Sequence, residues 1–301
     1  MKKETVVYLS SENIKLIVGS DDHNDMIKIY DFQKYPFAEG AMINGVITDE
    51  FEVKTTLKKV AEAGYNNVSL VIDSGQILSK SSIMPKMKSS QIIQFVKDEL
   101  SSLGENSEDL IYDYAYLGPS EEGKGASQIL CCALERKLIS NYLDIFKECG
   151  IEINAIDFSI NILSKLTQEL TGFDDKTYMI SILDGNNMTS VLFEKNHYKL
   201  SYRSRIIAAR SDAAYGDEIA SNIAHIYQFS KSGENSVPIE KVLFCGLLDE
   251  EAIVKERIRE TIKIEAEDFP TSRSIYIVNE GNKEAFELDD YILPVGFLFR
   301  K

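Results

Sequence analysis

Two short polar turns between apolar, β-branched runs are the places in this sequence best suited to bind an anion. The first turn, Ser10–Asn13, joins the runs Thr5–Leu9 and Ile14–Gly19. The second turn, Asp184–Asn187, leads into Thr189. A tight hairpin turn can present backbone N–H groups to a phosphate. The sequence therefore indicates two candidate phosphate-binding hairpins, although an Asp-Gly dipeptide also forms ordinary hairpin turns.

Cysteine and histidine residues offer no metal site. No C-x-x-C spacing occurs among the four cysteines, and the three histidines are scattered along the chain. Neither a G-x-S-x-G nucleophile motif nor a G-x-x-x-x-G-K-[ST] phosphate loop is present. We therefore expect buried, reduced thiols. We also expect no bound metal and no catalytic residue.

Charge and hydropathy exclude two further classes of function. The 301 residues carry 48 acidic and 33 basic side chains, which gives a net charge of −15. Such an acidic protein repels a phosphate backbone, so nucleic acid is not an expected partner. No apolar run approaches the roughly 20 residues that a membrane helix needs. The N-terminus has no apolar signal core. We expect a cytoplasmic protein.

The order of predicted elements repeats in the two halves of the chain. In both halves the predicted order is strand, strand, strand, helix, strand and helix, and in the first half the last helix follows the inserted segment described below. In the first half these elements are Thr5–Leu9, Ile14–Gly19, Met26–Asp31, Phe51–Ala63 and Val68–Ile72. In the second half they are Tyr178–Leu183, Thr189–Phe193, Tyr198–Arg203, Gly216–Lys231, Lys241–Cys245 and Glu250–Ile262. This repetition predicts two related α/β lobes around a cleft.

A segment between the halves does not fit the repetition. A helix capped by Ser89 or Ser90 is predicted there, with one apolar face formed by Ile92, Ile93, Val96, Leu100 and Leu103. Two strands follow, at Ile111–Gly118 and Gln128–Leu134. These elements predict a small inserted α+β subdomain. The next helix, Arg136–Glu148, has core spacing at Leu138, Ile139, Tyr142, Leu143 and Phe146.

The sequence resembles the PilM family of type IV pilus assembly proteins, which have an actin-like ATPase fold. The resemblance covers nearly the whole chain and is clearest at Ile83–Met87, Leu110–Gly118, Glu148–Asp157 and Tyr291–Arg300. It implies an α/β, RNase H-like duplicated fold of two lobes. Residues 1–175 would form the first lobe, with the inserted subdomain at about residues 76–134. Residues 176–301 would form the second lobe, which Tyr291–Arg300 would close as its terminal helix.

Members of this family bind ATP in the cleft, and the resemblance implies where a remnant of that site would lie. The corresponding residues are Lys15, Asp184, Thr189, Gly216, Asp217, Glu218 and Gly246. Gly216–Glu218 resembles a family step that contacts the nucleotide, and Gly246 is what remains of a glycine pair near the adenosine. An acidic start to a helix is also favoured by the helix dipole alone.

The same motifs depart from the family pattern at decisive positions. Tyr8 stands where the family has an acid, and Ser10 stands where it has a glycine. Glu12 adds negative charge to the first turn, Asn186 replaces a glycine in the second, and Leu247 would crowd a purine. These departures predict a pseudo-ATPase that needs no cofactor. The alternative is an ATPase in which magnesium and ATP regulate partner binding.

The resemblance also implies a function and partners. PilM holds the N-terminal cytoplasmic segment of the membrane protein PilN, at the inner face of the cell membrane, and links the pilus platform to its motor. A partner segment would lie between the first lobe and the inserted subdomain, with anchors among Ile83, Met84, Pro85 and Met87. We expect a scaffold with peripheral membrane contact, and self-association stays open. A cytoplasmic protein of a type II secretion platform is an alternative.

Two stretches free of acidic residues carry clustered cations. The first contains Lys80, Lys86, Lys88 and Lys97, and the second contains Lys195, Lys199, Arg203, Arg205 and Arg210. Such charges are usually solvated strand edges, where lysine discourages aggregation. The alternative is contact with acidic lipids or an acidic partner.

Overall fold

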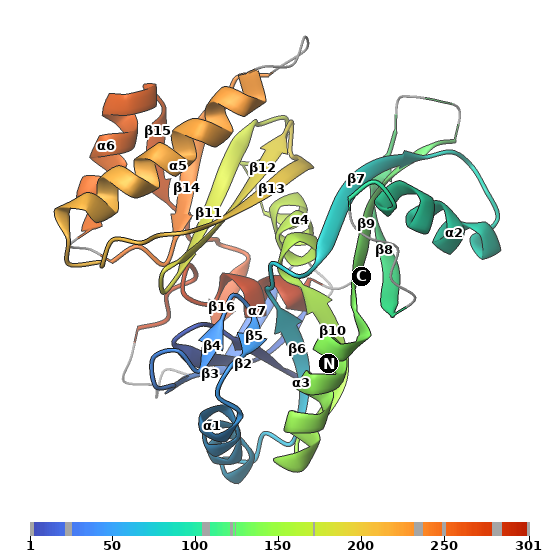
Figure 1. Cartoon of the computed structure of the whole chain (residues 1–301), viewed down its shortest axis with the longest axis vertical. Helices are drawn as coiled ribbons and strands as arrows, with labels where there is room; N and C mark the ends of the chain where they lie inside the picture. Colours follow the sequence, from blue (N-terminus) through green and yellow to red (C-terminus); the bar gives the residue numbers. More distant parts are fainter. Residues whose placement is uncertain are drawn as a thin grey trace.

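The chain folds into two α/β lobes with a smaller subdomain beside them (Figure 1). The computed structural model describes residues 3–21, 26–103, 109–120, 123, 125–170, 172–231, 237–248, 251–278 and 285–299. Two predicted element boundaries, Glu250 and Arg300, lie outside these residues. The predicted repetition of elements is confirmed, because in each lobe three antiparallel strands follow one another and a later strand pairs in parallel with the first.

The first lobe contains a six-stranded sheet whose order is β10-β6-β1-β2-β3-β16. Its strands are β1 (Glu4–Leu9), β2 (Asn13–Asp21), β3 (Ile27–Pro36), β6 (Asn67–Ile72), β10 (Glu152–Phe158) and β16 (Ile275–Ile277). Helices α1 (Glu50–Glu62) and α3 (Arg136–Glu148) cover one face and bury apolar residues against it. The Asp49 carboxylate caps α1 by accepting a hydrogen bond from the Glu52 N–H. A short hairpin, β4 (Met42–Ile43) with β5 (Val46–Ile47), precedes α1.

The second lobe contains a five-stranded sheet whose order is β13-β12-β11-β14-β15. Its strands are β11 (Tyr178–Asp184), β12 (Asn187–Glu194), β13 (His197–Arg205), β14 (Lys241–Cys245) and β15 (Glu265–Asp268). Helices α5 (Ala213–Lys231) and α6 (Ile253–Ile262) pack on its outer face. The inner faces of the two sheets share one apolar core with α4 (Ser159–Glu169) and α7 (Ile292–Leu298).

The end of the chain corrects the predicted division into lobes. Helix α7 contacts α4 and the first-lobe strands β1 and β2, and β16 pairs in parallel with β3. The prediction that residues 176–301 form the second lobe, closed by its own terminal helix, is therefore wrong for these last elements. Every residue of α7 is buried, so the helix needs apolar cover on all sides, which the space between the sheets supplies. A Cβ at Gly296 would approach Ile162 Cγ2 to 2.5 Å, so glycine permits the close contact with α4.

The inserted subdomain is a three-stranded sheet, ordered β7-β9-β8, with one helix on one face. Its elements are β7 (Leu78–Met84), α2 (Ser89–Leu100), β8 (Leu110–Pro119) and β9 (Ser127–Glu135). Lys88, not a serine, is the N-cap of α2, so the predicted serine cap is wrong. Three residues that were predicted to be core are exposed instead, namely Ile93, Leu103 and Leu143. In the described part of the chain, no helix has the length and apolar character needed to cross a membrane.

Candidate functional site between the two lobes

The two predicted phosphate-binding hairpins meet at the interface between the lobes. The β1–β2 turn comes from the first sheet and the β11–β12 turn from the second. Asp184 pairs with Asn187 across the second turn, and Gly185 within the turn has a left-handed φ of 57°. The side chain of Asp184, at the end of β11, points toward the first hairpin.

Asp184 binds the first hairpin directly. Both oxygens of its carboxylate accept the Ser11 N–H at 2.8 Å. Its Oδ2 also accepts the Ser11 hydroxyl at 3.1 Å and the Tyr8 hydroxyl at 3.2 Å. Asn187 Nδ2 donates to Ser11 Oγ at 3.0 Å. We call these contacts the hairpin clasp. In the hairpin clasp, the Ser11 N–H of the first turn, which could otherwise donate to a bound anion, donates to Asp184.

Burial shapes the ionisation of both clasp residues. Burial raises the pKa of Asp184 above its ordinary value, while the Ser11 N–H and Lys15 lower it. Burial, followed by the charge of Asp184, raises the pKa of the Tyr8 phenol well above its ordinary value. Tyr8 therefore stays protonated and is the hydrogen-bond donor. Tyr8 fills part of the interface, with only 4% of its surface exposed.

An ion pair between a buried aspartate and a partly buried arginine joins the lobes beside the clasp. Asp73 follows β6 in the first lobe, and Arg203 lies on β13 in the second. The Arg203 guanidinium contacts both carboxylate oxygens of Asp73, with an Nη1 to Oδ2 distance of 3.1 Å. Arg203 Nη1 also donates to Thr189 Oγ1 at 3.0 Å, and the Ser159 hydroxyl donates to Asp73. Burial alone would raise the pKa of Asp73, but Arg203 and these donors hold it below its ordinary value.

Two cations that were singled out in the sequence, Arg203 and Lys15, are paired with carboxylates of the chain itself. Arg203 was predicted as part of a solvated or partner-binding basic stretch, and the structure instead places it in an ion pair with the buried Asp73. Lys15 was predicted as a remnant of the nucleotide site. Its Nζ lies 3.5 Å from Asp290 Oδ1, just before α7, and Lys34 contacts the same carboxylate. The charge of Lys15 is therefore compensated within the chain.

Four of the predicted remnant residues line two cavities that share Arg210. A cavity of about 310 Å³ contains Lys15, Asp184, Gly246 and Leu247 in its lining, and a cavity of about 190 Å³ contains Gly216. Arg210 lines both, donates to the Gly246 carbonyl at 3.1 Å and pairs with Glu251 at 3.4 Å. A Cβ at Gly246, whose φ is 80°, would come within 2.4 Å of the Leu183 carbonyl oxygen. Glycine is thus required there by the backbone itself.

Asp217 and Glu218 have local structural roles. Asp217 forms an exposed ion pair with Arg257 at 3.2 Å. The Glu218 carboxylate accepts the N–H groups of Ile207 at 2.9 and 3.0 Å and that of Ala208 at 3.0 Å. Glu218 therefore fixes the connection between β13 and α5. The structure does not bring these two carboxylates to the clasp as interaction partners.

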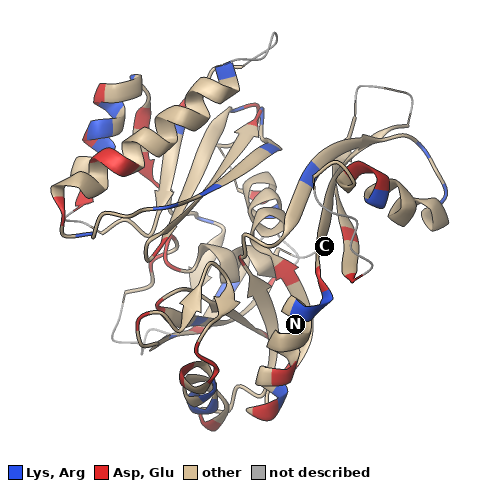
Figure 2. Cartoon of the chain, viewed as in Figure 1, with Lys and Arg blue, Asp and Glu red and all other residues tan. Residues whose placement is uncertain are grey.

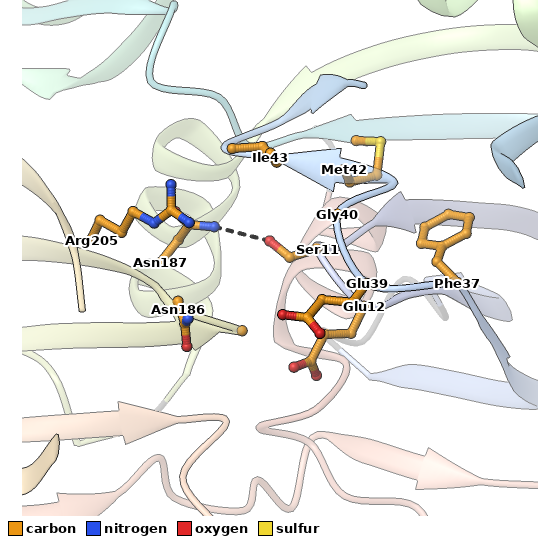
Figure 3. A pocket seen from close by; sticks show the side chains of 11 residues that line it. Ser11, Glu12, Phe37, Glu39, Gly40, Met42, Ile43, Asn186, Asn187 and Arg205 are labelled. Atoms are coloured by element: carbon orange, nitrogen blue, oxygen red, sulfur yellow. Dashed lines mark hydrogen bonds between the residues drawn. The ribbon is translucent and has the colours of Figure 1, made fainter. Parts of the chain in front are cut away.

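A third cavity, of about 300 Å³, opens at the mouth of the interface (Figure 3). Glu12 and Glu39 line it from the first lobe, and Asn186 and Arg205 line it from the second. Figure 3 shows both glutamate side chains on the side of the cavity opposite Asn186 and Arg205. Glu12 also lines the 310 Å³ cavity, so negative charge borders the clasp on two sides.

The residues of the cleft do not fit magnesium and ATP. The Ser11 N–H, a first-hairpin donor suited to a phosphate, is occupied by Asp184. Asp184 and Glu12 would repel phosphate charge, and Lys15 is paired with Asp290. Within the described residue ranges, no group of three or more histidine, cysteine or acidic side chains is arranged to hold a metal ion.

The predicted partner anchors separate into two kinds. Met84 is buried with Ile92 and Val96 in the core of the inserted subdomain, and Met87 packs against that core. Ile83 is 38% exposed, and Pro85 is exposed as well. The side chains available to a partner on this segment are therefore Ile83 and Pro85, with part of Met87.

Each of the two cationic stretches of the sequence has part of its cations on a strand, and these two strands lie in contact. β7 of the inserted subdomain contacts β13 of the second lobe, and Figure 2 shows cationic positions on both strands. Several of these cations have acidic partners: Lys80 with Glu99 at 2.9 Å, and Lys199 with Glu194 at 3.2 Å. Arg205 makes no ion pair with any residue that the structure describes. Much of the predicted basic character is therefore compensated locally.

Comparison with solved structures identifies the fold. A chain of the PilM–PilN type IV pilus biogenesis complex matches with a TM-score of 0.76 at 13% identity, over 98% of this chain and 96% of that chain. A Bacteroides thetaiotaomicron protein with an actin-like ATPase fold and unknown function matches at 0.54, with 9% identity over 99% and 96%. The cytoplasmic domain of EpsL, from the type II secretion system of Vibrio cholerae, matches at 0.52, with 11% identity over 100% and 96%. The chain has the actin-like fold that the sequence resemblance implied.

Sequence comparison gives the family. No curated protein matches the chain. A family model described as type IV pilus assembly protein PilM matches residues 7–267, which is most of the chain and spans both hairpins, the inserted subdomain and the second sheet. The resemblance noted from the sequence is thereby confirmed, and the protein belongs to the PilM family of type IV pilus assembly proteins.

Proposed function

We propose that this protein is a cytoplasmic scaffold of the type IV pilus assembly platform, which binds the N-terminal cytoplasmic segment of a PilN-like membrane protein. The observation that carries this proposal is the match to a chain of the PilM–PilN complex at a TM-score of 0.76 over 98% of the chain. Membership of the PilM family supports the same role. In this role the protein sits at the inner face of the membrane and is held there by its partner, and other platform or motor proteins bind it in turn.

The partner segment binds beside the inserted subdomain. β7 is an edge strand of that sheet, and Ile83 near its end is exposed while its neighbour Met84 is buried. An extended or short helical segment needs a few apolar anchors in such a position. Ile83 and Pro85 provide them without any change to the core of the subdomain.

The proposed scaffold does not hydrolyse ATP. Tyr8 stands at the position of the family acid and donates to Asp184, so it offers no carboxylate to a metal-bound water. The hairpin clasp and the pairing of Lys15 with Asp290 leave little in the described cleft to bind a triphosphate. The competing proposal is an ATPase that uses the 310 Å³ cavity beside Gly246, and it predicts binding of Mg-ATP.

Isothermal titration calorimetry tests both proposals on the full chain. We expect heat of binding with a peptide from the N-terminus of the neighbouring pilus membrane protein, no heat with a scrambled peptide, and no heat with Mg-ATP. Ile83→Asp should weaken peptide binding about tenfold or more, since burying an isoleucine side chain is worth about 1.5–3 kcal/mol. Ile93→Asp is the matched control, because both isoleucines are 38% exposed and Ile93 lies on α2 instead of β7.

Three outcomes would contradict the proposal. Absence of peptide binding to the folded wild-type chain would remove the scaffold role at this segment. An equal loss of affinity in both isoleucine variants would place the partner elsewhere or indicate general damage to the subdomain. Tight binding of Mg-ATP would favour the ATPase.

A further inference from the structure

The hairpin clasp is built like an anion-binding site whose anion belongs to the chain. The carboxylate of Asp184 accepts one backbone N–H with both oxygens and two hydroxyl groups with Oδ2. Hydrogen bonds from N–H and O–H donors to an ionised acceptor are about twice as strong as those between neutral groups. The donors come from the first lobe and the acceptor from the second, so the contact also joins the lobes.

We propose that Asp184 is a built-in anion, which takes the place of a nucleotide phosphate at the first hairpin and keeps the two lobes closed with no ligand bound. This inference concerns the relation of the lobes and does not depend on the partner proposed above. In this role Asp184 does not help to bind a nucleotide. Its carboxylate instead takes the place that a nucleotide phosphate would have at the first hairpin.

Competition for a single donor supports the proposal. A phosphate could reach the Ser11 N–H only if the Asp184 carboxylate moved away from it. Asp184 would then lie beside the phosphate, with Glu12 on the same turn, and like charges at short range repel. Lys15 would have to leave Asp290 to compensate that charge. The arrangement excludes a phosphate and satisfies its own donors.

Two further contacts act together with the clasp. The pair between Asp73 and Arg203 links the same two lobes and is coupled to the second hairpin through Thr189. Asn187, also on the second hairpin, donates to the hydroxyl of Ser11. Each contact therefore holds the second lobe, at or next to its first hairpin, against the first lobe, and all of these polar groups are paired when the lobes are closed.

Distances between spin labels on the two lobes test this inference. The four native cysteines are buried, so labels can be attached to cysteines introduced at Lys58 on α1 and His225 on α5, both exposed. Double electron–electron resonance on the labelled full chain should give one narrow distance distribution, unchanged by excess Mg-ATP. Asp184→Ala should broaden the distribution or add a longer distance. Asp144→Ala, an exposed acid on α3, is the control and should leave it unchanged.

Several results would contradict the proposal that Asp184 keeps the lobes closed. A broad distribution in the wild type, or one that Mg-ATP narrows or shifts, would overturn the proposal. So would a folded Asp184→Ala variant with the wild-type distribution. If Asp184→Ala does not fold, the wild-type chain with and without Mg-ATP still decides, and Tyr8→Phe, which removes one donor only, should give a smaller broadening.

Discussion

Two regions of the molecule differ in which side chains they bury. One is the interface between the two lobes, and the other is the inserted subdomain. At the interface, Asp73 is buried, Asp184 and Arg203 are partly buried, and each of these charged groups has a partner in the other lobe. On the inserted subdomain, apolar side chains such as Ile83 and Tyr116 remain exposed on the two edge strands. The charged groups of the cleft are thus paired within the chain, whereas the subdomain keeps apolar side chains on its surface.

Breaking the ion pair between Asp73 and Arg203 should have the largest effect on the free energy of unfolding. Arg203→Ala leaves Asp73 buried without its main partner, and such losses cost about 3–5 kcal/mol of unfolding free energy. Urea denaturation followed by far-UV circular dichroism measures this, and suits a chain that has no tryptophan. Arg205→Ala on the same strand is the control, because Arg205 is exposed; it should change stability by less than about 0.5 kcal/mol. Similar losses in both variants would mean that the pair contributes nothing special.

Shortening a core side chain of the inserted subdomain should cause the next largest loss of stability. Met84 is 5% exposed and Ile83 is 38% exposed, although the two are neighbours on β7. Met84→Ala should cost about 2 kcal/mol or more through lost burial and the cavity left behind. Ile83→Ala should change the same denaturation curve little, yet weaken peptide binding. If Ile83→Ala were the more destabilising of the two, the division into core and docking residues would be wrong.

The smallest effect is a dependence on pH. Because Arg203 and the neighbouring donors hold the folded-state pKa of Asp73 below its ordinary value, Asp73 stabilises the fold at neutral pH. That contribution is present above the unfolded pKa of roughly 3.9 and is lost as the pH falls through the folded pKa. The stability difference between wild type and Asp73→Asn should be constant from pH 7 to 5 and shrink toward pH 3. A difference that grows in acid would show that the pKa of Asp73 is raised instead.

Local patterns in the sequence were enough to predict most of the fold. Alternating and helical periodicity place both hairpins, α1, α3 and β14, since these depend on neighbouring residues. Asp184 was found because an Asp-Gly turn has a recognisable sequence. The role of Tyr8 could not be predicted from the sequence, because its hydroxyl donates a hydrogen bond to a residue 176 positions away.

The missed parts of the site depend on contacts between distant segments. Asp73 and Arg203 are 130 residues apart, and nothing near Arg203 in the sequence separates it from a surface cation. The Ser11 donor is a backbone N–H, which every residue except proline carries, so its type gives no signal. The return of β16 and α7 to the first lobe was missed for the same reason, since an apolar helix does not specify which sheet will cover it.

That return has a consequence for how the protein is made. A ribosome releases the strands β1 to β10 and helix α4 long before β16 and α7, so α4 can cover only part of the inner face of the first sheet until α7 is made. The first lobe should therefore stay partly uncovered until β16 and α7 have been made, and both lobes should then become protected together. Limited proteolysis can compare nascent chains stalled before β16 with chains in which an added linker carries residue 298 out of the ribosome. We expect resistance only in the second kind, and a resistant first lobe in the shorter chains would refute the inference.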